Sequence, residues 1–114
     1  MSDDGADWVK VAATSDVPLG QVIGVSVGER DIAIYHLEDD EYRATSNVCT
    51  HEFAQLSDGW LEDGTIECPL HGGVFDVRTG KGLCSPIEKN LRTFEVRVAD
   101  GDIFVRLADD RPSL

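Results

Sequence analysis

Hydrophobic and polar residues alternate in short runs along this chain, which is the period-2 pattern of β-strands with one buried face. Turn signals such as Asp39-Asp40, Asp63-Gly64 and Asp100-Gly101 separate the runs. The periodicity therefore favours strands over helices. The predicted strands are Trp8–Ala12, Gln21–Val27, Asp31–Leu37, Glu41–Ser46, Thr65–Cys68, Val74–Val77, Leu91–Val98 and Ile103–Leu107.

Many short strands without a predicted helix indicate an all-β fold, either an antiparallel β-sandwich or a partly open barrel. With 114 residues the chain is expected to form one domain, 1–114, which buries about two-thirds of the surface of its unfolded state. The stretch 46–82 is rich in glycine and is predicted to form a small subdomain inserted between the flanking strands.

Charge is unevenly divided along the chain. The net charge is −12, and residues 1–64 hold 14 of the 22 acidic side chains but only 3 of the 10 basic ones. This excess either keeps the protein soluble or steers it to basic patches on partner proteins, and both interpretations stay open. Nucleic acid is not an expected partner, because binding phosphates needs a basic face.

No stretch is long and apolar enough to cross a membrane, so no membrane association is expected. The segment 1–7 is acidic and polar, unlike a secretory signal. The chain has 3 cysteines, which give no disulfide framework and suit a reducing compartment. We therefore expect a cytoplasmic protein.

Two short motifs combine cysteine with histidine, Cys49-Thr50-His51 and Cys68-Pro69-Leu70-His71. Each offers one thiolate and one imidazole from a tight loop. This ligand set is typical of a Rieske 2Fe-2S centre, but tetrahedral zinc also accepts two cysteines and two histidines. His36, by contrast, alternates within an apolar run and is interpreted as a structural residue.

Several further segments match one known family, and the match spans roughly Trp8 to Leu107. On these segments the chain resembles the Rieske-type 2Fe-2S ferredoxins of bacterial aromatic-ring-hydroxylating dioxygenase systems, of the naphthalene or biphenyl dioxygenase kind. The matching segments are Leu56-Ser57-Asp58-Gly59, Glu67, Phe75-Asp76, Thr79-Gly80-Lys81 and Leu83-Cys84-Ser85-Pro86.

The resemblance implies a Rieske fold in which 46–82 is the cluster-binding subdomain. It also implies one Rieske-type 2Fe-2S cluster, with His51 and His71 on one iron and Cys49 and Cys68 on the other. A soluble one-electron carrier is then expected, not an enzyme. It would act as a monomer between a flavoprotein ferredoxin reductase and a Rieske non-haem iron terminal oxygenase in the degradation of aromatic compounds.

Two other classes of function remain as alternatives. One is a regulatory or structural subunit with a Rieske-like fold but no cluster, as in small nitrite reductase subunits. The other is a binding module stabilised by zinc. The presence of all four ligand residues and the length of the resemblance argue against both, and iron and acid-labile sulfide analysis separates the three.

Differences from the high-potential Rieske proteins of respiratory complexes predict a low midpoint potential. Those proteins have a disulfide between the ligand loops, where this chain has Ala54 and Leu70. They also have a serine and a tyrosine that donate hydrogen bonds to cluster sulfurs, where this chain has Gly73 and Phe75. Fewer donors stabilise the reduced state less, so we expect a midpoint closer to about −150 mV than to zero.

Three supporting roles are also predicted. Trp60, Phe53 and Leu56 are candidates for an apolar rim near the ligands, although core packing is the expected role of Trp60. Cys84 is interpreted as a small buried hydrophobic residue, because no other cysteine is left to pair with it. Pro86 is expected, from the resemblance, to shield the cluster.

Overall fold

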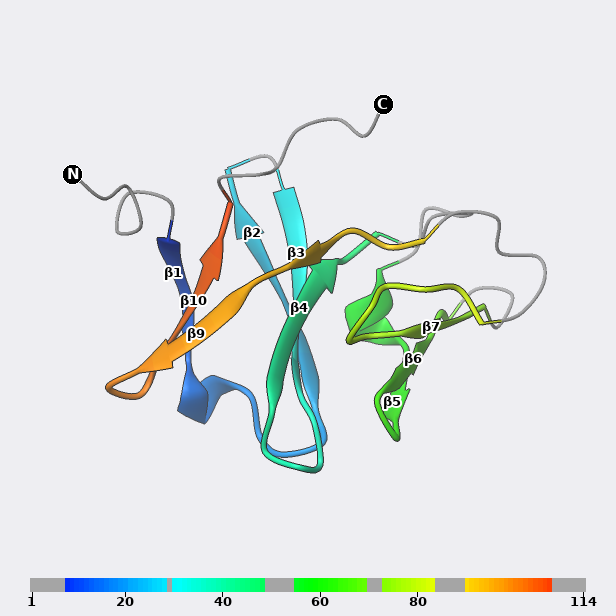
Figure 1. Ribbon diagram of the computed structural model, residues 1–114, viewed down its shortest axis with the longest axis horizontal. Coiled ribbons are helices and arrows are strands. Elements are labelled where there is room, and N and C mark those ends of the chain that lie inside the picture. Colours follow the sequence, from blue (N-terminus) through cyan, green and yellow to red (C-terminus); the bar gives the residue numbers. More distant parts are fainter. Residues whose placement is uncertain (1–7, 29, 49–54, 70–72, 84–89, 108–114) are drawn as a thin grey trace.

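The computed structural model describes residues 8–28, 30–48, 55–69, 73–83 and 90–107. In these residues the chain forms short antiparallel strands and two single turns of 3-10 helix (Figure 1). The strands are β1 (Trp8–Ala13), β2 (Val22–Val27), β3 (Arg30–His36), β4 (Tyr42–Ser46), β5 (Trp60–Glu62), β6 (Thr65–Glu67), β7 (Val74–Asp76), β8 (Thr93–Phe94), β9 (Val96–Ala99) and β10 (Asp102–Arg106), and the turns are η1 (Thr14–Asp16) and η2 (Leu56–Asp58).

The strands belong to three sheets, which we call the outer sheet (β1-β10-β9), the central sheet (β2-β3-β4-β8) and the small sheet (β5-β6-β7). In Figure 1 the central sheet lies between the other two. All pairings are antiparallel. The predicted all-β antiparallel fold is confirmed, and the sheets form an open arrangement instead of a closed barrel.

Strand β3 is buried on both of its faces. Ile32 and Ile34 pack with the outer sheet, whereas Ala33, Tyr35 and Leu37 pack with the small sheet, and all five are at most 2% exposed. The sequence suggested an ordinary alternating strand, but here both sets of side chains are covered because a layer lies on each side. Strand β3 therefore joins the two hydrophobic cores of the molecule.

The polar side chains of β3 have hydrogen-bond partners. Tyr35 donates its hydroxyl hydrogen to Thr45 Oγ1 at 2.8 Å, and Thr45 donates in turn to the carbonyl of Ser46. His36 Nδ1 lies 2.8 Å from the carbonyl oxygen of Val17. Its Nε2 lies 2.6 Å from Asp40 Oδ1, and its ring stacks on Tyr42. The interpretation of His36 as a structural residue agrees with these contacts.

Two-residue turns connect the hairpins that the sequence indicated. Asp63-Gly64 joins β5 to β6, and Asp100-Gly101 joins β9 to β10, with φ positive at all four residues. Positive φ at both central positions is the geometry of the type I′ turn, which matches the twist of the flanking strands. The turn predictions at these two places are confirmed.

The strand predictions were wrong in two places. The run Leu91–Val98 does not form one strand, because β8 pairs with β4 in the central sheet and β9 pairs with β10 in the outer sheet. The chain changes sheets at Glu95, which a hydrophobic pattern does not reveal. Strand β5, with only three residues, was not predicted at all.

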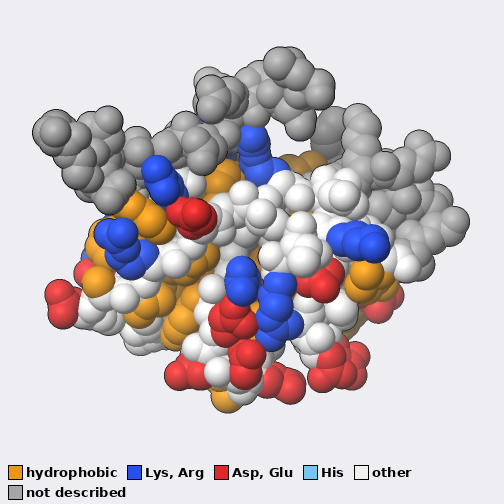
Figure 2. Space-filling view, in the orientation of Figure 1, with side chains coloured by type: hydrophobic (Ala, Val, Ile, Leu, Met, Phe, Trp, Pro, Cys, Tyr) orange, Lys and Arg blue, Asp and Glu red, His pale blue; other side chains and the backbone are white. Residues whose placement is uncertain are grey.

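Acidic side chains gather along the lower edge of the face in Figure 2, where Figure 1 places the β3–β4 and β5–β6 turns. The exposed acidic residues in and beside these turns are Glu38, Asp39, Asp40, Glu62 and Asp63.

No helix in the part of the chain that the structure describes has the length and apolar character to cross a membrane.

Candidate metal centre

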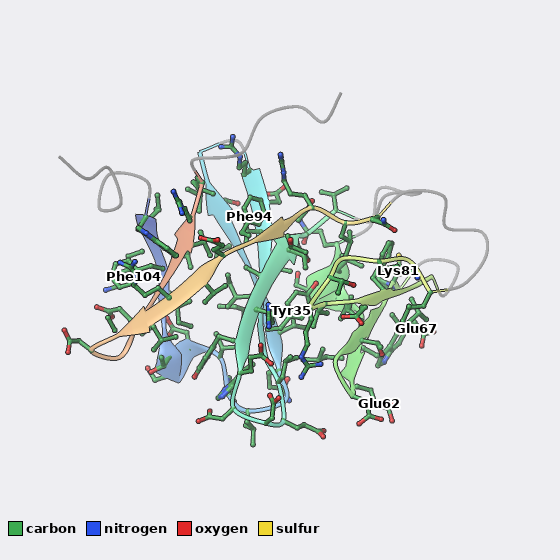
Figure 3. All side chains as sticks on the ribbon, viewed as in Figure 1. Tyr35, Glu62, Glu67, Lys81, Phe94 and Phe104 are labelled. Carbon is green, nitrogen blue, oxygen red and sulfur yellow. The ribbon has the colours of Figure 1, made fainter. Side chains whose placement is uncertain are left out.

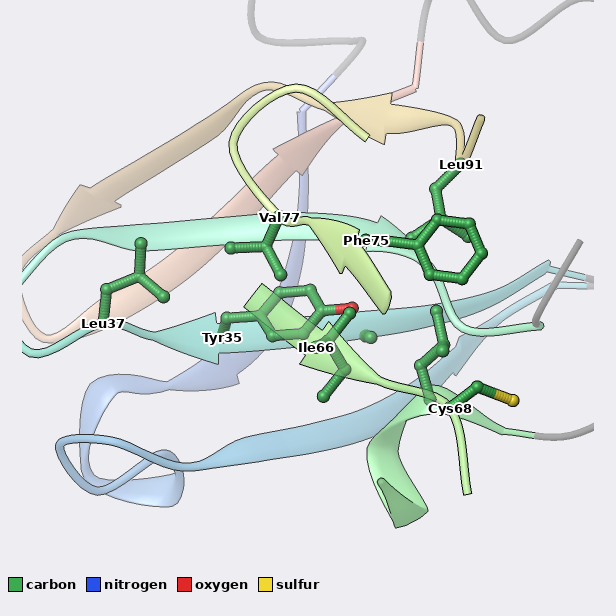
Figure 4. Close-up of a cluster of buried hydrophobic side chains, with 9 residues drawn as sticks. Tyr35, Leu37, Ile66, Cys68, Phe75, Val77 and Leu91 are labelled. Carbon is green, nitrogen blue, oxygen red and sulfur yellow. The ribbon is translucent and has the colours of Figure 1, made fainter. Parts of the chain in front are cut away.

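The second Cys/His motif begins at the end of β6. Glu67 pairs with Val74 of β7, and the backbone N–H of Cys68 donates to the carbonyl of Gly73 at 2.7 Å. Strand pairing thus fixes Cys68 at the base of the loop. Its side chain is fully buried in the apolar cluster that also contains Ile66 and Phe75. In Figure 4 the sulfur lies at the edge of this cluster and points away from the aromatic rings.

The first Cys/His motif follows the end of β4, and its two flanks are held together. Val48 and Gln55 form an isolated antiparallel bridge, and Leu56 donates its N–H to the carbonyl of Asn47 at 2.7 Å. The side chain of Asn47 adds two hydrogen bonds, because its Oδ1 accepts from the Ser57 N–H at 2.8 Å and its Nδ2 donates to Ser57 Oγ at 3.0 Å. Segment 49–54 therefore starts and ends at one fixed point.

This amide clamp, Asn47 with Ser57, needs space beside β2. A Cβ at Gly24 would lie 2.7 Å from Asn47 Nδ2 and 2.8 Å from Ser57 Oγ. Glycine leaves room for the two polar side chains against the central sheet. Asn47 is 2% exposed, so its amide would be costly to bury without these partners.

The flanks of the two motifs meet at the same end of the small sheet. A Cβ at Gly59 would lie 1.9 Å from the carbonyl oxygen of Glu67, so the backbone after η2 packs directly on the end of β6. Leu56 and Cys68 also belong to the same buried cluster. The chain around the first motif is thus placed next to the first ligand residue of the second.

A third segment, 84–89, is bracketed at the same sheet. Leu83 donates its N–H to the carbonyl of Val74 at 2.8 Å, and Gly82 donates to Asn90 Oδ1 at 3.0 Å. Leu91 donates to the carbonyl of Gly80, where φ is +78° and a Cβ would lie 2.2 Å from the Leu91 oxygen. Glycine is required at position 80 for both reasons.

The charged side chain of Arg78 ties the small sheet to the central sheet. Its Nε donates to Glu41 Oε1 at 3.0 Å and its Nη2 to Asp39 Oδ2 at 3.1 Å, so it connects the end of β7 to the β3–β4 turn. The guanidinium also covers Gly64, where a Cβ would lie 2.4 Å from Nη1. The hydrogen bond with Glu41, followed by the weaker effect of Asp39, raises the pKa of Arg78.

Cys68 is the only one of the four predicted ligands that lies within the described residues; Cys49, His51 and His71 lie outside them. The described part of the chain accordingly contains no group of three or more metal-ligating side chains. The predicted roles of Phe53, Cys84 and Pro86, and the replacements at Ala54 and Leu70, also fall outside it.

The expectation of a rim position for Leu56 and that of core packing for Trp60 were wrong. Leu56 is fully buried and packs in the core beside Cys68 instead of forming a rim. Trp60, expected in the core, is 61% exposed because its strand directs it to the outside of the small sheet. The Asn47–Ser57 clamp was not predicted, although Ser57 lies in a segment that resembles the family.

A groove of about 580 Å³ lies elsewhere, between the outer and central sheets. Its lining contains no cysteine or histidine, so it does not offer the ligands of the predicted centre. Within it Arg97 stacks over the ring of Trp8 at 4.3 Å. The lining residues are Trp8, Glu41, Tyr42, Arg43, Phe94, Glu95, Val96 and Arg97.

Comparisons with known proteins identify the family of this chain. Residues 7–95 match the Rieske [2Fe-2S] domain family. The ferredoxin component of the naphthalene 1,2-dioxygenase/salicylate 5-hydroxylase systems of a Ralstonia species is 45% identical over 101 residues, which cover 89% of this chain and 96% of the relative.

Two solved structures are also similar. One is described as a complex of reduced oxygenase and oxidized ferredoxin in carbazole 1,9a-dioxygenase, with a TM-score of 0.81 and 42% identity over 88% of this chain and 93% of the other. The second is the Sphingomonas yanoikuyae B1 ferredoxin, with a TM-score of 0.81 and 32% identity over 86% of this chain and 96% of the other.

Proposed function

This chain belongs to the Rieske [2Fe-2S] domain family, and we propose that it passes single electrons from a flavin-containing reductase to the Rieske non-haem iron oxygenase of a system that degrades aromatic compounds. The protein is a one-electron carrier with one Rieske-type 2Fe-2S cluster and is not itself an enzyme. The zinc-stabilised module and the subunit without a cluster are therefore set aside.

One observation carries the proposal: the chain spans nearly the whole length of small proteins that are ferredoxin components of aromatic dioxygenase systems. It is thus similar to complete carriers and not only to the Rieske domain of a larger oxygenase. The aromatic substrate is selected by the oxygenase and does not contact such a carrier.

We assign Cys49, His51, Cys68 and His71 as the ligands of the cluster. The fit rests on the donor set, two thiolates and two imidazoles, and on the position of Cys68, which is buried and fixed by strand pairing at the base of its loop. The amide clamp at the first loop holds the chain next to this position. When bound, the cluster supplies a reversible one-electron couple.

The protein's own residues around this position limit the hydrogen bonds available to the cluster. Gly73 has no side chain, and the fully buried Phe75 offers no donor. Backbone N–H groups remain as donors. This favours the predicted midpoint in the lower part of the Rieske range, near about −150 mV.

The details of the partnership are part of the same proposal. A flavoprotein supplies the electron, the oxygenase takes it, and the carrier works as a monomer in the cytoplasm. Its acidic turns favour approach to basic partner surfaces at low ionic strength. Light scattering on a gel-filtration column tests the monomer, and the salt dependence of electron transfer tests the steering.

Anaerobic purification tests the assignment of the ligands. The protein should be coloured and contain iron and acid-labile sulfide in equal amounts, and replacement of any assigned ligand by serine or alanine should abolish the visible absorption. Cys84→Ser is the matched control, because it makes the same chemical change at a cysteine outside the assigned set and should leave the spectrum intact.

The carrier role is tested with purified components. The holoprotein should be reduced by a flavoprotein reductase of an aromatic dioxygenase system and then reoxidised by the oxygenase, with product formed only when all three are present. A loaded holoprotein that no such reductase reduces would contradict the role while leaving the cluster assignment standing.

A further inference from the structure

We propose that one row of side chains on the outside of the small sheet is the docking face that both redox partners use in turn. The row consists of Trp60, Glu67, Val74 and Leu83, and we call it the outer row. This inference rests on the proposed function, since it names the surface through which the carrier meets its reductase and its oxygenase.

Strand register places these four side chains side by side. Trp60 pairs with Glu67, and Glu67 pairs with Val74. Directly paired residues of antiparallel strands lie on the same face of a sheet. Leu83 continues the row, because its N–H donates to the Val74 carbonyl and the neighbouring bridge joins Phe75 to Gly82.

The two faces of the small sheet differ sharply. The inner row directly behind, Leu61, Ile66 and Phe75, packs into the core beside β3, and Ile66 and Phe75 are fully buried. On the outer row Trp60 is 61% exposed and Leu83 is 47% exposed. Of the four large hydrophobic residues that are exposed within the described chain, these two stand at the two ends of the outer row, and the others, Leu19 and Val98, lie elsewhere.

The outer row has an exposed tryptophan at one end and an exposed leucine at the other, with the exposed Glu67 and the half-buried Val74 between them. Tryptophan is enriched among the residues that contribute a large share of interface free energy, so the exposed Trp60 is the candidate anchor for a partner. As a core residue Trp60 would have been explained by packing. Its side chain is instead mostly exposed, so core packing does not explain a tryptophan at this position.

The outer row also lies at the ligand end of the sheet. Glu67 directly precedes Cys68, and Val74 directly follows Gly73, so the row borders the loop that begins at the assigned ligand. The opposite end of the sheet carries the turn at Asp63-Gly64. A protein seated on the outer row is therefore beside the ligand loop, as electron transfer requires.

The charged side chains around the outer row indicate which kind of partner surface would be complementary to it. Glu62, Asp76 and Lys81 occupy the next row of the same face, and Figure 3 shows Glu62, Glu67 and Lys81 at this side of the molecule. Asp76 accepts the backbone N–H groups of Arg78 and Thr79, which leaves Glu62 and Glu67 as the carboxylates directed to a partner. The complementary surface of the partner would therefore have an apolar pocket for the indole of Trp60, surrounded by basic side chains that face Glu62 and Glu67.

A shared face follows from the single cluster. The carrier must bring the same ligand loop to both partners, and the outer row places two exposed apolar side chains, Trp60 and Leu83, on the face that borders this loop. Each partner must also leave before the next arrives, which suits a small patch with a polar surround.

The test uses the loaded holoprotein with Trp60→Ala and Leu83→Ala. Stopped-flow measurement at limiting carrier concentration gives the second-order rate constants for reduction by the reductase and for reoxidation by the oxygenase. We expect Trp60→Ala to lower both rate constants by about tenfold or more, and Leu83→Ala by less. Val98→Ala is the matched control, because it removes an exposed apolar side chain from the outer sheet and should change neither rate constant.

Visible absorption and the midpoint potential of each variant must match those of the parent, so that a slower rate reports docking. If Trp60→Ala loses the cluster, Trp60→Gln and Glu62→Gln take its place; the first should slow both transfers, and the second should weaken their dependence on salt.

Unchanged rates in these variants overturn the outer row as a docking face, and so does a loss confined to one partner. Failure of the parent protein to exchange electrons with either partner instead overturns the proposed function, so the two failures are distinguishable.

Discussion

The outer and central sheets, which together we call the framework, differ from the small sheet in what holds them together. Strands β1 to β4 have five to seven residues each and pair along their lengths, whereas the small sheet has three strands of three residues. The framework rests on continuous apolar faces. The small sheet also has a buried apolar core, which contains Ile66 and Phe75, but it is held in addition by close backbone approaches at glycines and by hydrogen bonds that bracket the ligand loops.

The two regions meet at β3, whose opposite faces belong to the two separate cores. The stability of the fold and the binding of the cluster can therefore be changed separately, provided that a substitution affects only one face of β3. Changes on the framework side should lower stability alone, and changes on the small-sheet side should also affect the cluster.

The largest expected effect comes from emptying each core in turn. Phe75→Ala in the small-sheet core should destabilise the fold by about 3–5 kcal/mol and Ile103→Ala in the framework core by about 2–5 kcal/mol, because both side chains are fully buried. Denaturation of the holoproteins followed by circular dichroism gives these losses. Only Phe75→Ala should also release the cluster below the unfolding transition, and equal loss of visible absorption in both variants would contradict the division.

A steric change at the junction of the first motif with β6 should have the next largest effect. Gly59 has an extended conformation, so Gly59→Ala is disfavoured only by contact with the Glu67 carbonyl, at about 1–3 kcal/mol. Faster loss of visible absorption on warming is the measurement. Gly20→Ala is the control, since it adds conformational strain of about 1–2 kcal/mol in open space and should not touch the cluster.

Removal of the amide clamp tests how far one contact holds the first ligand loop. Asn47→Ala leaves the Ser57 N–H without this acceptor and should destabilise the first ligand loop by about 1–3 kcal/mol. The electron paramagnetic resonance spectrum of the reduced protein should broaden. Ser26→Ala removes an exposed hydrogen bond of the central sheet and should leave the spectrum unchanged; broadening in both would assign the effect to general loosening.

The stability of the fold at alkaline pH depends on Tyr35 of β3, the strand that the two cores share. Burial, only partly offset by the hydrogen bond with Thr45, raises the pKa of Tyr35 well above its usual value of 10.0. The neutral phenol is favoured in the folded state, so its stabilising contribution is complete below pH 10 and declines above it by up to about 1.4 kcal/mol per pH unit. Tyr35→Phe should flatten the fall in thermal midpoint above pH 10, and an unchanged slope would contradict this origin.

The smallest expected change concerns the potential. Gly73→Ser combined with Phe75→Tyr adds two hydroxyl donors at the small sheet and should raise the midpoint measured by voltammetry. A midpoint potential of the parent protein well above zero would contradict the proposal that few side chains donate hydrogen bonds to the cluster. No substitution in the outer sheet is expected to move the value.

The sequence predicted the framework well because its signals are local. Alternation located most strands, and paired Asp-Gly residues located the hairpin turns, since each depends on neighbours in the chain. The same logic failed at β3, where the covering of both faces depends on two distant segments. It failed again at Glu95, where the chain changes sheets within one apolar run.

The candidate site divides in the same way. Cysteine and histidine types with their spacing predict the chemistry, and the family match confirms the cluster, while the four individual ligands stay a prediction. The sequence left the rim and core positions of Trp60 undecided, because the strand pairing that directs its side chain outward depends on distant residues. The Asn47–Ser57 clamp was not predicted, because it depends on the space left at Gly24.

The pairing of β4 with β8 brings together the two ends of the chain segment between these strands, which makes that segment a candidate for replacement by engineering. The chain leaves the central sheet at Ser46 and returns beside the same point, where Thr45 faces Thr93 and Ser46 bonds to Arg92. The chain between Ser46 and Arg92 thus has its two ends as close together as those of a hairpin turn. A two-residue turn in its place would close the framework, and a foreign redox unit with equally close ends would fit the same opening.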